Sequence, residues 1–282
     1  MIKIDHDCSC DANPLIPQVC RVIQVTEETC DVKSFKVQTL DGKAPFEFVP
    51  GQLGMFGIAP HGECMFCVSM GGNDWLEFTV KKVGTVTERL HLLHPGAQVI
   101  VRGPYGNYWP TEECKGRDML FIAGGIGLPP VRTFLLHTLE NRADYGRIDL
   151  VYSASTKTDL VFKEQLFELW PKEPNTHVHV SVYRDCDENN NCTISYTAPF
   201  LEGLGLDVSN TTAVLCGGPS LYRTCSQALT NMGVADENIL TTLEMRMKCG
   251  IGKCGRCNVG SKYICLDGPV FTQAEVNTML KD

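Results

Sequence analysis

The chain has 282 residues, of which 43% are hydrophobic and 21% are charged. At about 100–200 residues per domain this length predicts about two domains, and the composition excludes a disordered or fibrous protein. The formal net charge of −8 disfavours nucleic acid as a partner, because the protein's field repels phosphate backbones. We expect no membrane span, since no apolar run reaches about 18–20 residues. The first residues lack the pattern of a secretory signal, which favours a cytoplasmic location.

The first part of the chain reads as short strands separated by turns, with one amphipathic helical stretch. Strands at this spacing indicate an antiparallel barrel or sandwich. The expected strands are Val19–Val25, Val32–Thr39, Glu47–Val49, Gln52–Ile58, Met65–Met70, Trp75–Lys81 and Gln98–Arg102, and the expected helix is Val86–Leu93.

The second part alternates apolar strands with helical patterns, which predicts a parallel α/β sheet. The expected strands are Met119–Ala123, Ile148–Ser153, Val178–Tyr183, Ala213–Cys216 and Ile239–Leu243, and the expected helices are Pro130–Glu140, Leu160–Leu169 and Leu221–Met232. The remaining C-terminal region is rich in Gly and Cys and too small to hold a core of its own. We divide the chain into an N-terminal extension (1–13), a β-barrel (14–110), an α/β domain (111–244) and a Cys-rich appendage (245–282).

The strongest chemical signal is a C-x4-C-x2-C-x7-C pattern near the C-terminus. The chain holds fifteen cysteines, a count that indicates metal or redox chemistry in a reducing compartment where the spacing supports it. The spacing and intervening glycines match plant-type [2Fe-2S] ligation, in which the loop aims N–H groups at the cluster. A four-cysteine zinc site and plain buried thiols are the alternatives. The candidate ligands are Cys249, Cys254, Cys257 and Cys265.

Two glycine-rich turns follow strands of the expected parallel sheet. Such turns let backbone amides approach a pyrophosphate, and two of them at strand ends would line one crevice. Tight turns without a ligand are the alternative. The candidate residues are Gly124, Gly125 and Gly127 in the first turn, and Cys216, Gly217, Gly218 and Pro219 in the second. On this reading a Gly127→Val substitution is expected to weaken nucleotide binding.

A third turn lies in the expected barrel, directly before its helix. Backbone N–H groups and hydroxyls at a helix start suit a diphosphate, although an ordinary N-cap explains the same residues. The candidate residues are Gly84, Thr85, Val86 and Thr87.

The order of the motifs resembles the ferredoxin-NAD(P) reductase superfamily. The motifs are P-G-Q at 50–52, K-x-V-G-x-x-T at 81–87, R-G-P-Y-G-N at 102–107, G-G-I-G-x-x-P at 124–130, C-G-G-P at 216–219 and the cysteine signature at 243–271. Within it, the chain is similar to the iron-sulfur flavoprotein branch. That branch includes the gamma subunits of sulfhydrogenases, a subunit of anaerobic sulfite reductase and the electron-transfer subunits of dihydroorotate dehydrogenase. The resemblance covers about residues 14–275.

The resemblance implies FAD on the barrel, with the pyrophosphate at Gly84–Thr87. It also implies that Cys67, Val68 and Ser69 lie along the isoalloxazine and ribityl chain. The family's usual R-x-Y-S is replaced here by Cys64-Met65-Phe66-Cys67. These cysteines form a C-x-x-C, but positions along a strand rarely suit a metal or a disulfide. Cys216 stands where the family places a residue near the nicotinamide.

The implied function is electron transfer between NAD(P)H, FAD and a [2Fe-2S] cluster. The protein would serve a larger iron-sulfur oxidoreductase as part of a hetero-oligomer, with an iron-sulfur partner subunit or a ferredoxin as partner. The alternatives are a free-standing ferredoxin-NAD(P) reductase and a regulatory subunit that binds nucleotide without turnover. No residue is assigned a catalytic role, because the organic chemistry belongs to the cofactors.

The sequence leaves two smaller features open. Cys8, Cys10 and Cys20 could ligate a cluster shared with another subunit, or they are free thiols. For the nucleotide, the family places the 2′-position near residues 153–156 and 183–185. The first segment offers hydroxyls, and in the second the charge of Arg184 is partly cancelled by Asp185, so we favour NAD(H) over NADP(H).

Overall fold

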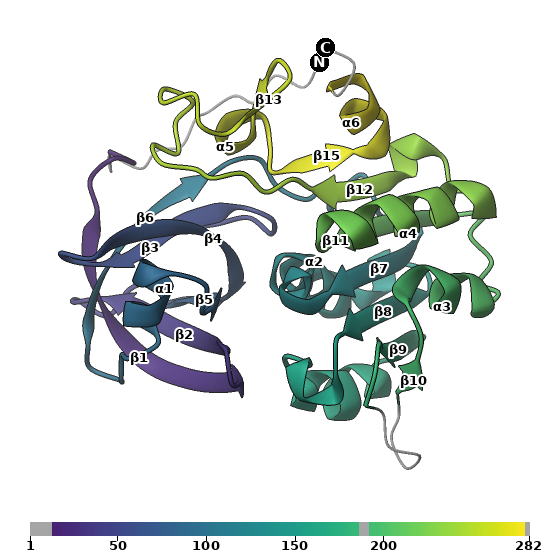
Figure 1. Cartoon of the computed structure of the whole chain (residues 1–282), viewed down its shortest axis with the longest axis horizontal. Helices are drawn as coiled ribbons and strands as arrows, with labels where there is room; N and C mark the ends of the chain where they lie inside the picture. The colour runs from purple at the N-terminus through teal and green to yellow at the C-terminus, as the bar shows by residue number, and fades with distance from the viewer. Residues whose placement is uncertain (1–12, 186–191, 280–282) are drawn as a thin grey trace.

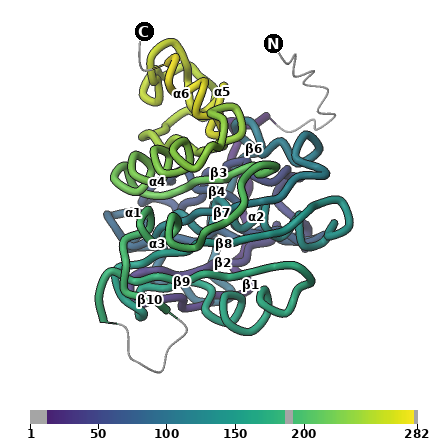
Figure 2. The backbone as a smooth tube through the Cα atoms, turned by 90° about the vertical axis from the view of Figure 1, so that its right-hand side faces the viewer, coloured from purple at the N-terminus to yellow at the C-terminus, as the bar shows by residue number. Residues whose placement is uncertain are grey.

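The computed structural model describes residues 13–185 and 192–279. Figure 1 shows a barrel on the left and an α/β sheet on the right, with the C-terminal segment running across the top of both. From the side, this segment lies at one end of the molecule (Figure 2). Within the described ranges, no helix is both long and apolar enough to cross a membrane.

The barrel is closed by six antiparallel strands in the order β1-β2-β5-β4-β3-β6. Its core is aromatic: Phe56 stacks on Phe78 with ring centroids 5.1 Å apart, and Phe35 lies 5.7 Å from Phe56. The expected barrel is thereby confirmed. Its elements are β1 (Gln18–Thr29), β2 (Val32–Thr39), β3 (Leu53–Ile58), β4 (Gly62–Gly71), β5 (Leu76–Lys81), α1 (Thr85–Leu90) and β6 (Gln98–Tyr105).

The expected strand Glu47–Val49 is wrong, because this segment is irregular. The Val49 N–H donates to the side chain of Gln52 at 2.8 Å instead of to a neighbouring strand. Phe48 packs against the barrel core from outside the sheet. The apolar residues here thus belong to a loop that packs against the barrel core.

The second domain is a seven-stranded sheet in the order β10-β9-β8-β7-β11-β12-β15, parallel except for β15. Its strands are β7 (Asp118–Gly124), β8 (Ile148–Ala154), β9 (Thr176–Val182), β10 (Thr193–Ile194), β11 (Thr211–Cys216), β12 (Ile239–Thr242) and β15 (Val270–Thr272). Its helices are α2 (Leu128–Glu140), α3 (Thr197–Gly203) and α4 (Pro219–Met232). The predicted parallel α/β sheet is confirmed, and the helix expected at Leu160–Leu169 is present as a short irregular helical run over residues 163–172, with a wide turn at Gln165–Leu169 and a tighter one at Trp170–Lys172.

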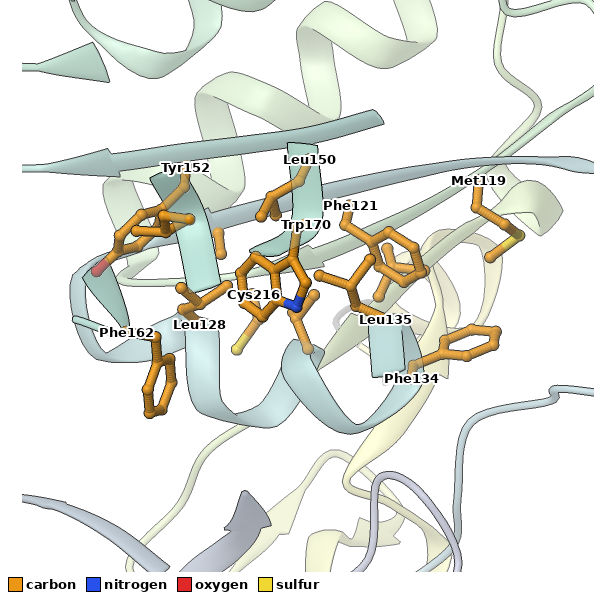
Figure 3. Close-up of a cluster of buried hydrophobic side chains, with 14 of the residues drawn as sticks. Met119, Phe121, Leu128, Phe134, Leu135, Leu150, Tyr152, Phe162, Trp170 and Cys216 are labelled. Carbon is orange, nitrogen blue, oxygen red and sulfur yellow. The ribbon is translucent and has the colours of Figure 1, made fainter. Parts of the chain in front are cut away.

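The main core of this domain lies between the sheet and α2 (Figure 3). Phe121 of β7 meets Phe134 of α2 edge to face at 5.5 Å. Phe134 also stacks on Trp109, whose indole donates to Pro130 O at 3.0 Å. Helix α2 contacts β4 of the barrel as well. It therefore joins the two domains, while α3 and α4 pack on the other face of the sheet.

The C-terminal region is more closely joined to the sheet than the sequence suggests. It holds β13 (Asn258–Val259), β14 (Lys262–Tyr263), α5 (Ile264–Asp267) and α6 (Gln273–Met279) besides β15. Strand β15 pairs antiparallel with β12, so the sheet extends into the segment expected to be an appendage. A small apolar cluster forms there as well, made of Cys257, Ile264, Cys265, Phe271, Val276 and Met279.

Candidate functional site

A cleft of about 910 Å³ lies between the barrel, α2 and the C-terminal segment. This volume suits a large organic cofactor. The barrel supplies residues of β3, β4 and β5. The α/β domain supplies the start of α2 and residues 242–244, and the C-terminal segment supplies residues 245–247, Arg256 and Pro269. Its lining includes Leu53, Cys64, Met65, Phe66, Cys67, Thr79, Ile126, Pro129, Met247 and Arg256.

Only part of the predicted flavin segment faces this cleft. Cys67 lines it, and burial holds the pKa of its thiol well above the usual value. Val68 is 1% exposed and packs in the barrel core. Ser69 is fully buried, and its hydroxyl donates to Glu77 Oε1 at 3.1 Å. The lining of the cleft by β4 therefore ends at Cys67, and the next two residues lie inside the barrel.

The turn before α1 is organised by Thr87, which lines the cleft. Its hydroxyl oxygen accepts from the N–H groups of Val83 and Gly84, both at 2.9 Å, and its hydroxyl donates to Gly84 O at 2.8 Å. Thr85 and Val86 are the first two residues of α1. The N–H groups of a helix's first turn have no partner within the helix. The turn therefore offers donors at the edge of the cleft.

The two glycine-rich turns meet at one edge of the sheet. Strands β7 and β11 are parallel neighbours, and Ala123 pairs with Cys216 where both strands end. Between the turns lies a second pocket of about 380 Å³, lined by Gly124, Ile126, Gly127, Cys216, Gly217, Gly218, Pro219, Tyr222, Thr242, Leu243 and Glu244. Four of these residues also line the larger cleft, so the two spaces adjoin.

The glycines of these two turns differ in what a side chain at their position would meet. A Cβ on Gly127 would lie 2.4 Å from Cys216 O, so its role is close contact between the turns. A side chain at Gly127 would therefore meet the neighbouring backbone first, although Gly127 itself lines the pocket. A Cβ on Gly218 would meet nothing within 4 Å. Gly125 also has open space, but its φ of +53° disfavours other residues.

Three of the four candidate cluster cysteines, Cys249, Cys254 and Cys257, lie on one loop. The fourth, Cys265, lies in α5, after the β13–β14 hairpin. Gly250, Gly252 and Gly255 have φ between +69° and +77°, which lets the loop curl around its own interior. The N–H groups of Ile251 and Cys254 donate to Cys249 Sγ, both at 3.4 Å, and that of Gly252 donates to Cys265 Sγ at 3.1 Å. The loop therefore aims backbone donors at the cysteine sulfurs, which suits anionic thiolates.

The four thiols of this region lie as two pairs rather than as one shell around a single ion. Cys257 Sγ and Cys265 Sγ lie 3.3 Å apart, and Cys254 interacts with Cys249 through its side chain. Among the described residues, no three His, Cys, Asp or Glu side chains form a group that could hold a single ion. Two pairs on a glycine-rich loop fit a two-iron cluster better than one tetrahedral zinc.

The thiols of this loop differ in acidity. Desolvation opposes ionisation of Cys249, but the N–H groups of Ile251 and Cys254 outweigh it and lower the pKa of its thiol to about 6. Desolvation, followed by the hydrogen bond with Cys257, raises the pKa of Cys265. Cys254 is exposed at the tip of the loop, whereas Cys257 and Cys265 are buried.

The other cysteines that the sequence singled out have different surroundings where the structure describes them. Cys20 is fully buried in the barrel core, and this burial raises the pKa of its thiol to about 12. It therefore cannot ligate a shared cluster, and Cys8 and Cys10 lie outside the described residues. Cys64 is a free thiol on β4. Cys216 lies beside the smaller pocket, with Sγ 2.9 Å from Thr242 Oγ1.

Two buried arginines near the site escaped the sequence analysis. Arg132 on α2 pairs with Glu77 on β5, with Nη1 and Oε1 2.6 Å apart. Arg102 on β6 pairs with Glu63 on β4 and reaches the cysteine loop. Arg102 is the first residue of the R-G-P-Y-G-N motif. The motif singled out this position but did not indicate which residues Arg102 contacts. Arg132 carried no signal in the sequence.

Comparison with known proteins gives the same picture. Residues 121–227 match the oxidoreductase NAD-binding domain, and residues 244–277 match the iron-sulfur cluster binding domain of dihydroorotate dehydrogenase B. The chain is 38% identical to the sulfhydrogenase 1 gamma subunit of Pyrococcus furiosus, over 92% of this chain and 90% of the relative. It is 32% identical to a probable electron-transfer subunit of dihydroorotate dehydrogenase B from the same organism, over 89% and 91%.

A solved structure shares the fold. It is a chain from the NADH-dependent reduced ferredoxin-NADP oxidoreductase, with a TM-score of 0.73 at 21% identity, covering 92% of each chain. Together with the relatives above, it confirms the resemblance seen in the motifs. The chain therefore belongs to the family of the sulfhydrogenase gamma subunits and the electron-transfer subunits of dihydroorotate dehydrogenase B, as an NAD(P)H-dependent oxidoreductase with a nicotinamide nucleotide and an iron-sulfur cluster as cofactors.

Proposed function

We propose that this chain is the diaphorase-type subunit of a larger iron-sulfur oxidoreductase related to the sulfhydrogenases. In this proposal the 910 Å³ cleft holds FAD and the 380 Å³ pocket holds the nicotinamide and the pyrophosphate of the nucleotide. Residues 14–110 form the flavin domain, 111–244 the nucleotide domain and 245–282 the cluster region. The four cysteines of the C-terminal loop hold the [2Fe-2S] cluster.

The observation that carries this proposal is that one cleft is bounded by all three regions. Cys67 comes from the barrel, Ile126 from the glycine-rich turn, and Met247 and Arg256 from the cysteine loop. A flavin in this cleft would therefore contact both the nucleotide pocket and the cluster loop. Bound there, the flavin supplies the exchange between two-electron hydride transfer and one-electron transfer. The chain's own residues contribute proximity and orientation.

The surface around Cys254 supports a partner beside the cysteine loop. Cys254 is exposed, and the surrounding segment carries five exposed cations in a chain of net charge −8: Arg246, Lys248, Lys253, Arg256 and Lys262. Exposed Tyr263 and Leu266 lie on the same segment. An iron-sulfur partner subunit or ferredoxin with an acidic face would be steered to this surface, and salt would weaken the steering. We also propose a cytoplasmic location, which suits the exposed free thiol of Cys30.

Turnover of the flavin-replete chain tests this function. We expect NADH oxidation with benzyl viologen as artificial acceptor. A flavin-replete chain that binds NADH but reduces no acceptor would instead support a regulatory subunit. Purification from the native host would separate the remaining alternative, since a free-standing reductase brings no partner subunits with it.

The cysteine loop gives a compositional prediction. We expect anaerobically purified protein to contain about two irons and two acid-labile sulfides per chain. A Cys254→Ser substitution should remove the cluster and leave FAD bound, because Cys254 is exposed and does not line the cleft. Exposed Cys30 provides the control, and Cys30→Ser should retain both cofactors. One zinc per chain without sulfide would contradict the cluster assignment, and equal loss of FAD in Cys254→Ser would contradict the separation of the two sites.

The choice between NAD and NADP gives a second prediction. The N–H of Arg184 donates to Ser155 O at 3.2 Å, so the two segments expected at the ribose 2′-position adjoin. Asp185 directly follows Arg184, and a free 2′-hydroxyl suits an acidic neighbour better than a 2′-phosphate does. We expect a preference for NADH in steady-state kinetics, little changed by Arg184→Ala. A preference for NADPH that disappears in Arg184→Ala would contradict this choice.

A further inference from the structure

Arg102 is a buried cation whose donors all have partners. It lies on β6 and is 7% exposed. Its Nε donates to both carboxylate oxygens of Glu63 at 3.0 Å, and Nη2 lies 2.5 Å from Glu63 Oε1. Its Nη1 donates to the hydroxyl of Tyr105 at 2.8 Å. These contacts stay within the barrel, and they fix the plane of the guanidinium group.

The same guanidinium also reaches the cysteine loop. Nη1 donates to Cys249 O and Nη2 donates to Lys248 O, both at 3.2 Å. The two carbonyls lie 146 and 147 residues away in the chain. Only a planar fork of donors can serve a carboxylate on one edge and two carbonyls on the other, so lysine could not replace it. The carboxylate of Glu63 neutralises the buried charge of Arg102. The other N–H groups of Arg102 can therefore donate to neutral carbonyls.

The loop rests directly on the barrel beside this arginine. A Cβ on Gly250 would lie 2.7 Å from the ring of Tyr105, so the loop can only make this approach with glycine. Leu53, Met55 and Tyr105 form a buried apolar cluster, against which Met247 and Ile251 of the loop pack. Leu53 and Met247 also line the large cleft. The junction that seats the cysteine loop is therefore continuous with one wall of the flavin cleft.

We propose that Arg102, held in place by Glu63, is a positioning residue that fixes Cys249 and its loop against the flavin barrel. It touches neither a thiol nor the cleft, and it acts through the backbone carbonyls of the ligand residue and of its neighbour. Partners of metal ligands in this position typically change metal affinity or activity by about 10–100-fold when they are lost. The inference rests on the proposed function, because it takes Cys249 as a cluster ligand.

The test compares Arg102→Gln, Arg102→Lys and Glu63→Gln with the unchanged full chain, all purified anaerobically with FAD. Arg21→Gln is the control, because Arg21 is exposed on β1 and lies far from the loop in sequence. Iron release to a chelator and the electron paramagnetic resonance spectrum report on the cluster. Stopped-flow absorbance separates reduction of the flavin by NADH from the later reduction of the cluster. Flavin content and thermal midpoint report on the barrel.

We expect Arg102→Gln to release iron about tenfold faster or more and to slow cluster reduction, while flavin reduction by NADH and flavin content stay unchanged. Arg102→Lys and Glu63→Gln should shift both cluster readouts less, in the same direction, and Arg21→Gln should shift neither. Unchanged iron release and cluster reduction in all three variants would overturn the inference. So would parallel loss of FAD and iron, because it would place the effect in barrel stability. Absence of a cluster in the unchanged chain would contradict the proposed function instead.

Discussion

Replacing Gly218 with Asp is expected to weaken NADH binding by at least about tenfold, without loss of stability. Gly218 lines the smaller pocket and has a φ of −62°, and a Cβ there meets no atom within 4 Å. It is also the N-cap of α4, where Asp is a preferred residue that favours the helix. Two unit charges about 4 Å apart repel by about 4 kcal/mol near a protein surface, so a carboxylate facing a pyrophosphate has a large effect.

Gly218→Asn is the matched control, because Asn has a similar size and caps a helix as well as Asp does. Titration of NADH by fluorescence measures the affinity, and urea denaturation measures the stability. We expect Asn to weaken NADH binding much less than Asp does. Equal effects of Asn and Asp would show that the side chain's volume rather than its charge matters. Unchanged affinity in both variants would contradict the assignment of this turn to the nucleotide.

Gly127→Val cannot test the nucleotide site in the way that the Gly218 variants do. Its Cβ would overlap the backbone of Cys216, and overpacking of this kind costs about 1–3 kcal/mol or more. We therefore expect Gly127→Val to lower the urea midpoint together with the NADH affinity. The sequence showed that both turns are rich in glycine. It could not show which glycine faces a ligand and which faces another strand, because that depends on how β7 and β11 pair.

The parts of the fold that depend on local pattern could be predicted well. The period-two alternation of apolar and polar residues predicted most barrel strands, and the strand expected at Val32–Thr39 has the same bounds as β2 in the structure. Strand β15 was not predicted, because three residues leave no periodicity to detect. Its place beside β12 is decided by tertiary pairing. Helix α3 (Thr197–Gly203) escaped for a similar reason, since it has only seven residues and one of them is a proline.

The same distinction applies to the site. Three of the four cysteines lie within nine residues, so spacing alone indicated their chemistry. The family resemblance assigned Ser69 to the flavin together with Cys67 and Val68, but the hydroxyl of Ser69 is held by Glu77 inside the barrel. The partners of Arg102 are remote in sequence, and no local rule brings Cys249 to it. Residues that act through tertiary contacts thus became visible only in the folded chain.

The second buried arginine joins the two domains. Arg132 on α2 and Glu77 on β5 have side chains that are 5% and 6% exposed. Arg132 also donates to Ser69 O at 3.3 Å and to Gln165 Oε1 at 2.8 Å. From Ser69 a chain of hydroxyl contacts continues to Thr79, which lines the large cleft. The contact between barrel and α2 is therefore polar and has multiple partners.

Arg132→Met is expected to be among the most destabilising substitutions in this chain. It leaves the carboxylate of Glu77 buried without its cation, and breaking a buried pair in this way costs about 3–5 kcal/mol. The double variant Arg132→Met with Glu77→Leu removes both charges, and we expect it to recover most of the loss, since apolar replacements of a buried pair are often neutral. Lys172→Met is the control, because its pair with Glu168 is largely exposed and should contribute at most about 1 kcal/mol. Urea midpoints of the four chains measure these effects. A loss in Arg132→Met no larger than in Lys172→Met would show that the domains are held together by the apolar contacts of α2 alone.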